Sequence, residues 1–229
     1  MKETIYTIPV TEAFEKRDGC PICSLYHMLE EREIDSITGA SMMEPDVRLE
    51  TNRQGFCPEH YHMMEAQNAK LPLGLMLQSH LDEIHKKLAA AQPAKGKPEK
   101  PMECAAGVNR SCYVCGRING FMEKICGTVC YLWKKEPEFR ELLREQPYFC
   151  MPHFELLLRT AGGAFPFGAG QGEFVQALYE KQLETMEALS GDVAWFCKKF
   201  DYRFKDADWK NSKDAPERAI AFLSGDGGK

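Results

Sequence analysis

The sequence lacks any apolar run of about eighteen residues, the length that a helix needs to cross a lipid bilayer. It also lacks an excess of positive charge, because its formal net charge is −5. A general nucleic-acid binder needs a basic face that displaces counterions from phosphates. We therefore expect neither a membrane span nor general nucleic-acid binding.

The amino-terminal residues 1–19 have no long apolar stretch behind Lys2, as a secretory signal peptide would have. We therefore expect a cytoplasmic location, where thiols stay reduced. In that compartment ten cysteines, several of them in CxxC-type pairs, favour metal binding over disulfides.

Signals for β-strands are nearly absent. Residues 4–10 are the one candidate, and Pro9 weakens it. Helical apolar spacing is clear in residues 24–37, 73–88 and 173–189. The pattern predicts an all-α protein.

Three strings occur twice along the chain in the same order. Cys20-Pro-Ile-Cys23 matches Cys112-Tyr-Val-Cys115, and Glu44-Pro-Asp-Val-Arg48 matches Glu136-Pro-Glu-Phe-Arg140. Phe56-Cys-Pro-Glu-His60 then matches Phe149-Cys-Met-Pro-His153. The offset is 92 residues for the first two strings and 93 for the third. This agreement predicts an internal duplication that gives two pseudo-symmetric helical halves.

The predicted domains follow from this repeat. Residues 1–90 form the first copy and residues 112–200 the second, which carries a glycine-rich insert at 161–173. Residues 91–111 are rich in Pro, Lys and Gly and are expected to form a flexible linker. Residues 201–229 are expected to form a tail with a short final helix, for which Asp214 is the N-cap.

Each copy contains three cysteines and one histidine at metal-ligand spacing. Thiolates and imidazole together suit Zn²⁺, which takes four ligands tetrahedrally in structural sites. The sequence predicts two closed zinc sites, each pinning one half. The first consists of Cys20, Cys23, Cys57 and His60, and the second of Cys112, Cys115, Cys150 and His153.

Three thiolates and one Zn²⁺ leave each site with a net charge of about −1, which favours nearby donors or cations. Arg48 and Arg140 occupy equivalent places in the two copies and are candidates for that role. The alternative is that they form surface or capping salt bridges to Glu44 and Glu136.

Other interpretations stay open at this point. Three cysteines and a histidine could also hold an iron–sulfur cluster. Cys126 and Cys130 could form a redox pair or be buried small residues, and Cys104 and Cys197 are single thiols. An enzyme with a pocket between the halves, near the glycines of the insert 161–173, is a further alternative.

The strings IYTIPVTEAFE, GCPIC, MMEPDVRLETNRQGFCPEH and NSKDAPERAIAFL resemble an uncharacterised cysteine-rich bacterial family, a domain of unknown function. The resemblance covers nearly the whole chain. It implies paired metal sites and a cytoplasmic bacterial setting, and it transfers no catalytic residue. With closed ligand sets and no convergent acid, base or nucleophile, we expect a zinc-stabilised binding or adaptor protein with an unknown protein or small-molecule partner.

Overall fold

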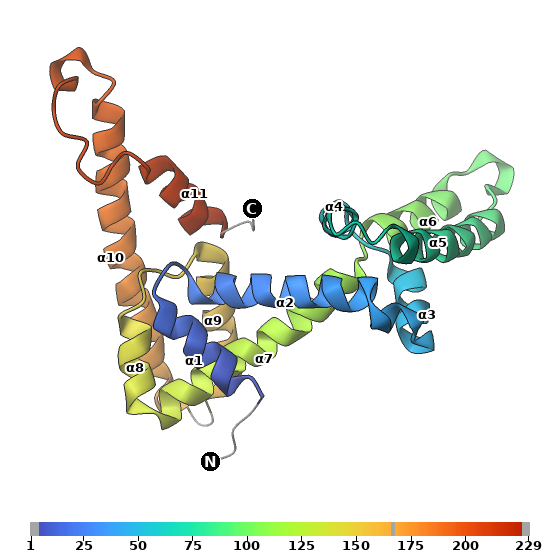
Figure 1. The fold of residues 1–229 in the computed structure, drawn as a ribbon, viewed down its shortest axis with the longest axis horizontal. Coiled ribbons are helices and arrows are strands. Elements are labelled where there is room, and N and C mark those ends of the chain that lie inside the picture. The colour runs from blue at the N-terminus through green and yellow to red at the C-terminus, as the bar shows by residue number, and fades with distance from the viewer. Residues whose placement is uncertain (1–4, 166–167, 226–229) are drawn as a thin grey trace. The chain divides into compact units, whose positions relative to one another are not determined.

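The structure, a computed structural model, describes residues 5–165 and 168–225, and over those residues it contains helices and no strand (Figure 1). Within the same ranges, no helix combines the length and the apolar character that spanning a membrane requires. The α-helices are α1 (Thr7–Lys16), α2 (Pro21–Thr38), α3 (Pro45–Gln54), α4 (Pro58–Ala66), α5 (Lys70–Ala90), α6 (Glu99–Asn109), α7 (Tyr113–Lys135), α8 (Pro137–Arg144), α9 (Met151–Ala164), α10 (Gln171–Lys198) and α11 (Ala215–Ser224). Short 3₁₀ turns are η1 (Ala40–Met43), η2 (Ala94–Gly96) and η4 (Tyr202–Phe204).

The order of helices is the same in both copies of the repeat. A helix precedes each CxxC pair, and a long helix follows it. Next come a short helix, a helix that begins beside the CxxH pair, and a second long helix. The helices α1 to α5 thus correspond in order to α6 to α10. This order agrees with the predicted duplication, which remains an inference from the sequence.

The chain forms two compact units, and neither coincides with one copy of the repeat. Unit 1 consists of residues 1–27 and 122–229, and unit 2 of residues 28–121. The long helices α2 and α7 therefore each contribute one end to each unit. Each unit combines the start of one copy with the end of the other, which corrects the expectation that each half is a separate body.

Proline sets the start of several short helices. Pro45, Pro58 and Pro137 each occupy the first helical position, where the fixed φ of proline suits the helix and its missing N–H costs nothing. Asp214 precedes α11 as predicted, with Pro216 in the first turn. Its carboxylate pairs with Arg218 at 3.1 Å and makes no hydrogen bond to the helix backbone.

Two segments differ from the sequence-based expectation. Of the candidate strand 4–10, residue 4 lies outside the described residues and residues 7–10 begin α1, whose buried face of Val10, Ala13 and Phe14 has helical spacing. The predicted linker 91–111 is also mostly helical, because α6 occupies residues 99–109 and packs against α5. The irregular connection is therefore limited to the few residues between α5 and α6.

The core of unit 1 is aromatic. Phe14 of α1 lies 4.9 Å from Phe139 and 6.2 Å from Phe149 between ring centroids. Trp133 contacts Phe174 at 5.5 Å, and all five rings are fully buried. Large rings of this kind bury much apolar area, so unit 1 has a substantial apolar core in addition to any metal centre.

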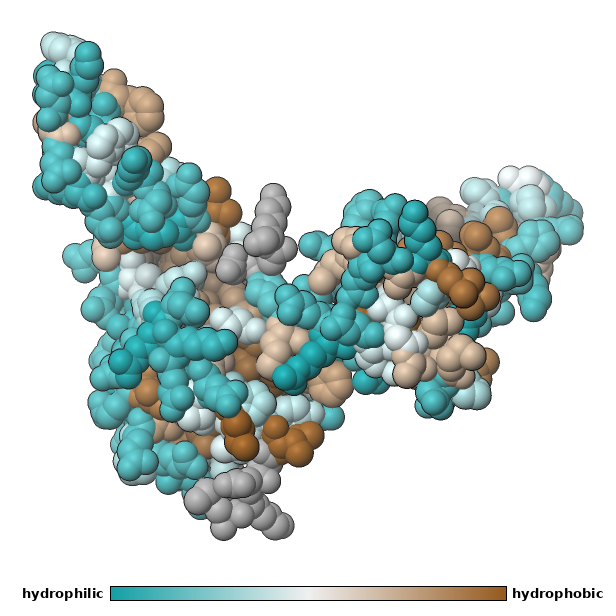
Figure 2. Space-filling view, viewed as in Figure 1, coloured by the Kyte–Doolittle hydropathy of each residue, from teal (hydrophilic) through white to brown (hydrophobic). Residues whose placement is uncertain are grey.

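Unit 2 has a smaller core, formed mainly by Ile34, Ile37, Phe56, Met64 and Ile118. In Figure 2 the surface is mostly hydrophilic, with hydrophobic residues reaching it in the region of α3, α5 and α6. The exposed leucines of these helices include Leu49, Leu71, Leu81 and Leu88. Unit 1 also exposes large apolar side chains, among them Leu183, Phe200 and Leu223.

Candidate metal centres

All eight predicted ligands come together, in two groups of four. Cys20, Cys23, Cys150 and His153 form centre 1, which lies within unit 1. Cys57, His60, Cys112 and Cys115 form centre 2, which lies within unit 2. In each centre one donor atom per residue lies within 4.8 Å of the other three.

The predicted pairing of the ligands is wrong. Each centre takes its CxxC pair from one copy of the repeat and its CxxH pair from the other. The reason is the length of the helix that follows each CxxC pair. An α-helix rises about 1.5 Å per residue, so α2, with its 18 residues, is some 27 Å long and leads the chain away from the cysteines at its start.

Every ligand lies at or near the start of a helix. Cys57 and Cys150 are the N-caps of α4 and α9, and the histidine three residues later falls in the first turn on the same face. Cys23 and Cys115 lie in the first turns of α2 and α7. The free N–H groups and the dipole of a helix start stabilise negative charge, which favours thiolate.

The donor atoms of centre 1 are closely spaced. The Nδ1 atom of His153 lies 3.1 Å from the Sγ of Cys150, 3.3 Å from that of Cys23 and 3.7 Å from that of Cys20. The Sγ atoms of Cys23 and Cys150 are 3.6 Å apart. The three cysteines are buried and His153 is half-buried. Centre 1 is therefore an enclosed set of one nitrogen and three sulfur donors.

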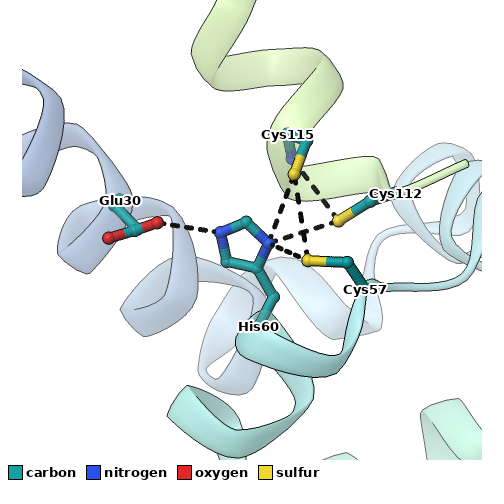
Figure 3. A network of polar contacts seen from close by, with 5 residues as sticks. All are labelled: Glu30, Cys57, His60, Cys112 and Cys115. Atoms are coloured by element: carbon teal, nitrogen blue, oxygen red, sulfur yellow. Dashed lines mark hydrogen bonds and ion pairs between the residues drawn. The ribbon is translucent and has the colours of Figure 1, made fainter. Parts of the chain in front are cut away.

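Centre 2 repeats this geometry in a more open setting, shown in Figure 3. The Nδ1 atom of His60 lies 3.0 Å from the Sγ of Cys57, 3.3 Å from that of Cys112 and 3.5 Å from that of Cys115. The Sγ atoms of Cys57 and Cys115 are 3.9 Å apart. All three cysteines are half-buried, whereas His60 is buried.

These spacings fit a single ion in a tetrahedron. With Zn–S of about 2.3 Å and Zn–N of about 2.0 Å, the edges of a regular tetrahedron are about 3.8 Å between sulfurs and about 3.5 Å between sulfur and nitrogen. The sulfur–sulfur distances of 3.6 and 3.9 Å lie close to the first value. The donor set and its spacing therefore suit one tetrahedral ion per centre.

Glu30 supports the histidine of centre 2. Its Oε1 lies 3.1 Å from the Nε2 of His60, on the side of the ring that faces away from the sulfurs (Figure 3). A carboxylate in this place fixes the ring with its proton on Nε2 and leaves Nδ1 free to bind a metal. The repeat could not reveal this residue, because the position 92 residues later is Met122.

Within each centre, the neighbouring side chains shift one another's pKa values. Burial acts to lower the pKa of His60, but hydrogen bonding and charge from Cys112 and Cys57 outweigh it and raise that pKa to about 9. Burial acts to raise the pKa of Cys112, yet the hydrogen bond with His60 helps to lower it to about 6. For Cys115, burial and the negative charge of Cys112 raise the pKa.

The thiols of centre 1 also shift one another's pKa values. Burial opposes ionisation of Cys20, but hydrogen bonds from Cys150 and Cys23 bring its pKa well below the usual value. The same interaction with Cys20 raises the pKa of Cys150. In each centre, ionisation of one thiol thus raises the pKa of another, and a divalent cation would relieve this repulsion and allow three thiolates together.

Arg48 and Arg140 have a different role from the predicted one. Arg48 donates from Nη2 to the Leu75 carbonyl at 2.9 Å and to the Ser79 hydroxyl, both on α5. Arg140 donates from Nε to the Trp133 carbonyl at 2.7 Å, and its Nη1 lies 3.7 Å from a Glu173 carboxylate oxygen. Within the described part of the chain, these contacts join helices and do not reach the metal ligands.

The remaining cysteines lie outside both centres. Cys126 and Cys130 are buried in α7, and burial raises the pKa of each thiol to about 12. Such thiols stay protonated at neutral pH and react slowly, as buried small residues would. Cys104 is half-buried in α6 and Cys197 is exposed near the end of α10.

Most of the glycine-rich insert 161–173 is helical. Its first residues end α9 and its last residues begin α10, while residues 166–167 lie outside the described residues. Gly168 and Gly170 have φ values of 72° and 81°, which suit glycine at the turn between these helices. The described part of the insert therefore belongs mainly to the helices α9 and α10.

Comparison with known protein families gives a match over nearly the whole chain. The family described as "Family of unknown function (DUF6062)" matches residues 1–228, and the chain belongs to that family. No curated protein matches the chain significantly. No solved structure matches it significantly either.

Proposed function

For this member of a family of unknown function, we propose a binding protein whose helical scaffold is held together by two structural zinc ions. The observation that supports it most is the grouping of three thiols and one imidazole nitrogen within 4.8 Å, twice in the chain. Four protein donors fill a tetrahedral shell and leave no coordination position for water or substrate. A structural role therefore fits better than metal-assisted hydrolysis.

Each ion would join the two copies of the repeat. In centre 1 the metal would tie the start of α2 to the start of α9, and in centre 2 the start of α4 to the start of α7. Metal binding would then contribute directly to the free energy of folding, because the unfolded chain does not hold these four donors together.

The donor spacing favours zinc over an iron–sulfur cluster. A cluster distributes its ligands over several iron atoms, so it needs more room than donors that lie within 4.8 Å of one another provide. A thiol redox function is also less well supported, since Cys126 and Cys130 are buried and burial raises their pKa values to about 12. Ten free cysteines suit a reducing compartment, so we propose a cytoplasmic location.

The metal can be tested on the purified full-length chain. Elemental analysis after anaerobic purification is expected to give two zinc per chain and no stoichiometric iron, and the protein should be colourless. Replacing zinc with Co²⁺ should give the visible absorption bands of tetrahedral cobalt–thiolate coordination. Stoichiometric iron with a brown colour would overturn the zinc assignment.

The structural role needs a separate measurement. Removing the metal with a chelator under reducing conditions should lower the thermal unfolding temperature, and adding back zinc should restore it. Magnesium added at the same concentration is the control, because it prefers oxygen ligands. An unchanged unfolding temperature after complete metal loss would exclude a structural role.

A further inference from the structure

The helix α6 packs against α5 without burying any of its own side chains. None of its residues is fully buried, and Cys104 and Val108 are only partly covered. An 11-residue helix has little intrinsic stability in water and normally depends on burying an apolar face. The space between α5 and α6 is therefore incompletely filled by the protein itself.

That space is a groove of about 700 Å³ within unit 2. The size lies within the range of small-molecule sites. Its apolar wall comes from α5 and α6 and is formed mainly by Ile84, Ala90, Ala91 and Val108.

The polar part of the wall is fixed by its own hydrogen bonds. The Nδ1 atom of His80 lies 2.8 Å from the Asn52 carbonyl oxygen. Ser111 donates to the Gln54 carbonyl at 2.7 Å. These bonds join the end of α3 to α5 and to the start of α7, so this end of the groove is preformed.

The groove is bordered by three cationic side chains, each from a different helix, and by one carboxylate. The cations are Arg53 of α3, Lys87 of α5 and Lys100 of α6, and the carboxylate is Glu103. Arg53 and Lys87 pair with Glu50 and Glu83 at 2.6 and 3.3 Å, but these are solvent-exposed pairs within one helix. Such pairs contribute little stability, so both cations are available to a ligand.

We propose that this groove binds a small amphipathic anion, an acid with an apolar body that lies between α5 and α6. The acid group faces Lys87 and Lys100, and the apolar body covers Ile84 and Val108. The proposal rests on the binding role proposed above and names its ligand class. It is independent of the metal, so metal content and ligand binding can fail separately.

The binding test uses two matched fluorescent probes with the full-length, metal-loaded chain. The anion 8-anilinonaphthalene-1-sulfonate should bind saturably at one site. Its neutral analogue, N-phenyl-1-naphthylamine, has the same rings without the acid. Replacing both cations, in Lys87→Ala/Lys100→Ala, should weaken the anion by about tenfold, as expected for two exposed charge contacts, and leave the neutral probe unchanged.

Lys86→Ala is the matched control for charge. It lies on the same helix beside Lys87, is exposed and does not border the groove. An equal loss in Lys86→Ala, or no loss in the double variant, would overturn the assignment of the acid group.

The site itself is tested by filling the groove. A Cβ at Gly107 would meet no atom within 4 Å, so Gly107→Leu adds bulk to the groove wall from a position with room for a side chain, and it favours the helix. It should abolish binding of both probes. Gly120→Leu is the control, because Gly120 is also helical and open but lies outside the groove. Unchanged binding in Gly107→Leu, with zinc content and helicity intact, would overturn the proposal.

Competition with decanoate tests whether the groove binds a free small acid or a membrane surface. Free decanoate below its micelle concentration should displace the anionic probe and slow alkylation of Cys104, while alkylation of the exposed Cys197 stays unchanged. Co-sedimentation with phosphatidylglycerol vesicles, without displacement by decanoate, would point to a membrane surface and contradict a site for a small molecule.

Discussion

The two metal centres have the same ligands in different surroundings. In centre 1 all three cysteines are buried, whereas in centre 2 all three are half-buried. Gly225 also lies close to centre 1, since a Cβ on it would be 3.7 Å from the Cys150 sulfur and 3.9 Å from the Cys23 sulfur. Centre 2 has instead the carboxylate of Glu30 on its histidine. Equal ligand sets therefore need not hold metal equally well, because solvent access and supporting hydrogen bonds differ.

The largest expected effect tests which ligands share an ion. Cys20→Ser/Cys150→Ser removes two ligands of centre 1 and should cost one zinc per chain. Cys20→Ser/Cys57→Ser removes one ligand from each centre and should cost both. Elemental analysis of the two purified variants decides this. If the ligands paired within each copy of the repeat, these two results would be exchanged.

Loss of metal should affect the two units unequally. Unit 1 has the buried rings of Trp133, Phe139 and Phe174, whereas in unit 2 the helix α6 buries no side chain. Cys112→Ser should therefore remove most of the hydrogen-exchange protection in α3 to α6, while Cys20→Ser should leave much of the protection in α8 to α10. Equal loss of hydrogen-exchange protection in both units would show that the two cores contribute equally to stability without metal.

Glu30→Gln tests the support of His60. The amide keeps the shape of the side chain but removes the charge that orients the ring, so the zinc affinity of centre 2 should fall by about 10–100-fold. Competition with a chromogenic chelator measures it, and centre 1 should be unchanged. Glu31→Gln, an exposed neighbour on α2, is the control. An equal loss in both variants would indicate a general effect of charge.

Exposure of the sulfurs should set the rate of metal release. Centre 2 should transfer zinc to a chelator faster than centre 1, by about tenfold, because its sulfurs are open to attack. The time course should have two phases, and Cys20→Ser should abolish the slow one. A single phase in the native protein would mean that burial does not control release.

The smallest effect is expected at Gly225. Its φ of 84° and ψ of 160° belong to a region that is nearly restricted to glycine. Gly225→Ala should move this segment away from centre 1 and speed zinc release there by a few-fold, with little change in the unfolding temperature. Ser224→Ala is the control, because its neighbouring position in α11 needs no such conformation. Release at the native rate in Gly225→Ala would show that the segment does not shield the metal.

Local chemistry made much of the protein predictable. The all-helical fold, the starts of α3, α4 and α8 at proline and the eight candidate ligands follow from residue type and spacing. Glu30 could not be found in this way, because it has no counterpart in the repeat and its spacing from His60 is not a motif. The helix at 99–109 was missed because Pro and Gly before it suggested a linker throughout.

The amino-acid sequence by itself determined the eight donors and the helix starts that carry them, since both depend on short-range chemistry. Only the tertiary structure decided how the donors combine. Joining Cys23 to Cys150 instead of Cys57 closes a loop about four times longer, which costs only about 1 kcal/mol of chain entropy. The burial of aromatic rings in unit 1 outweighs that cost, and it cannot be read from the spacing of cysteines.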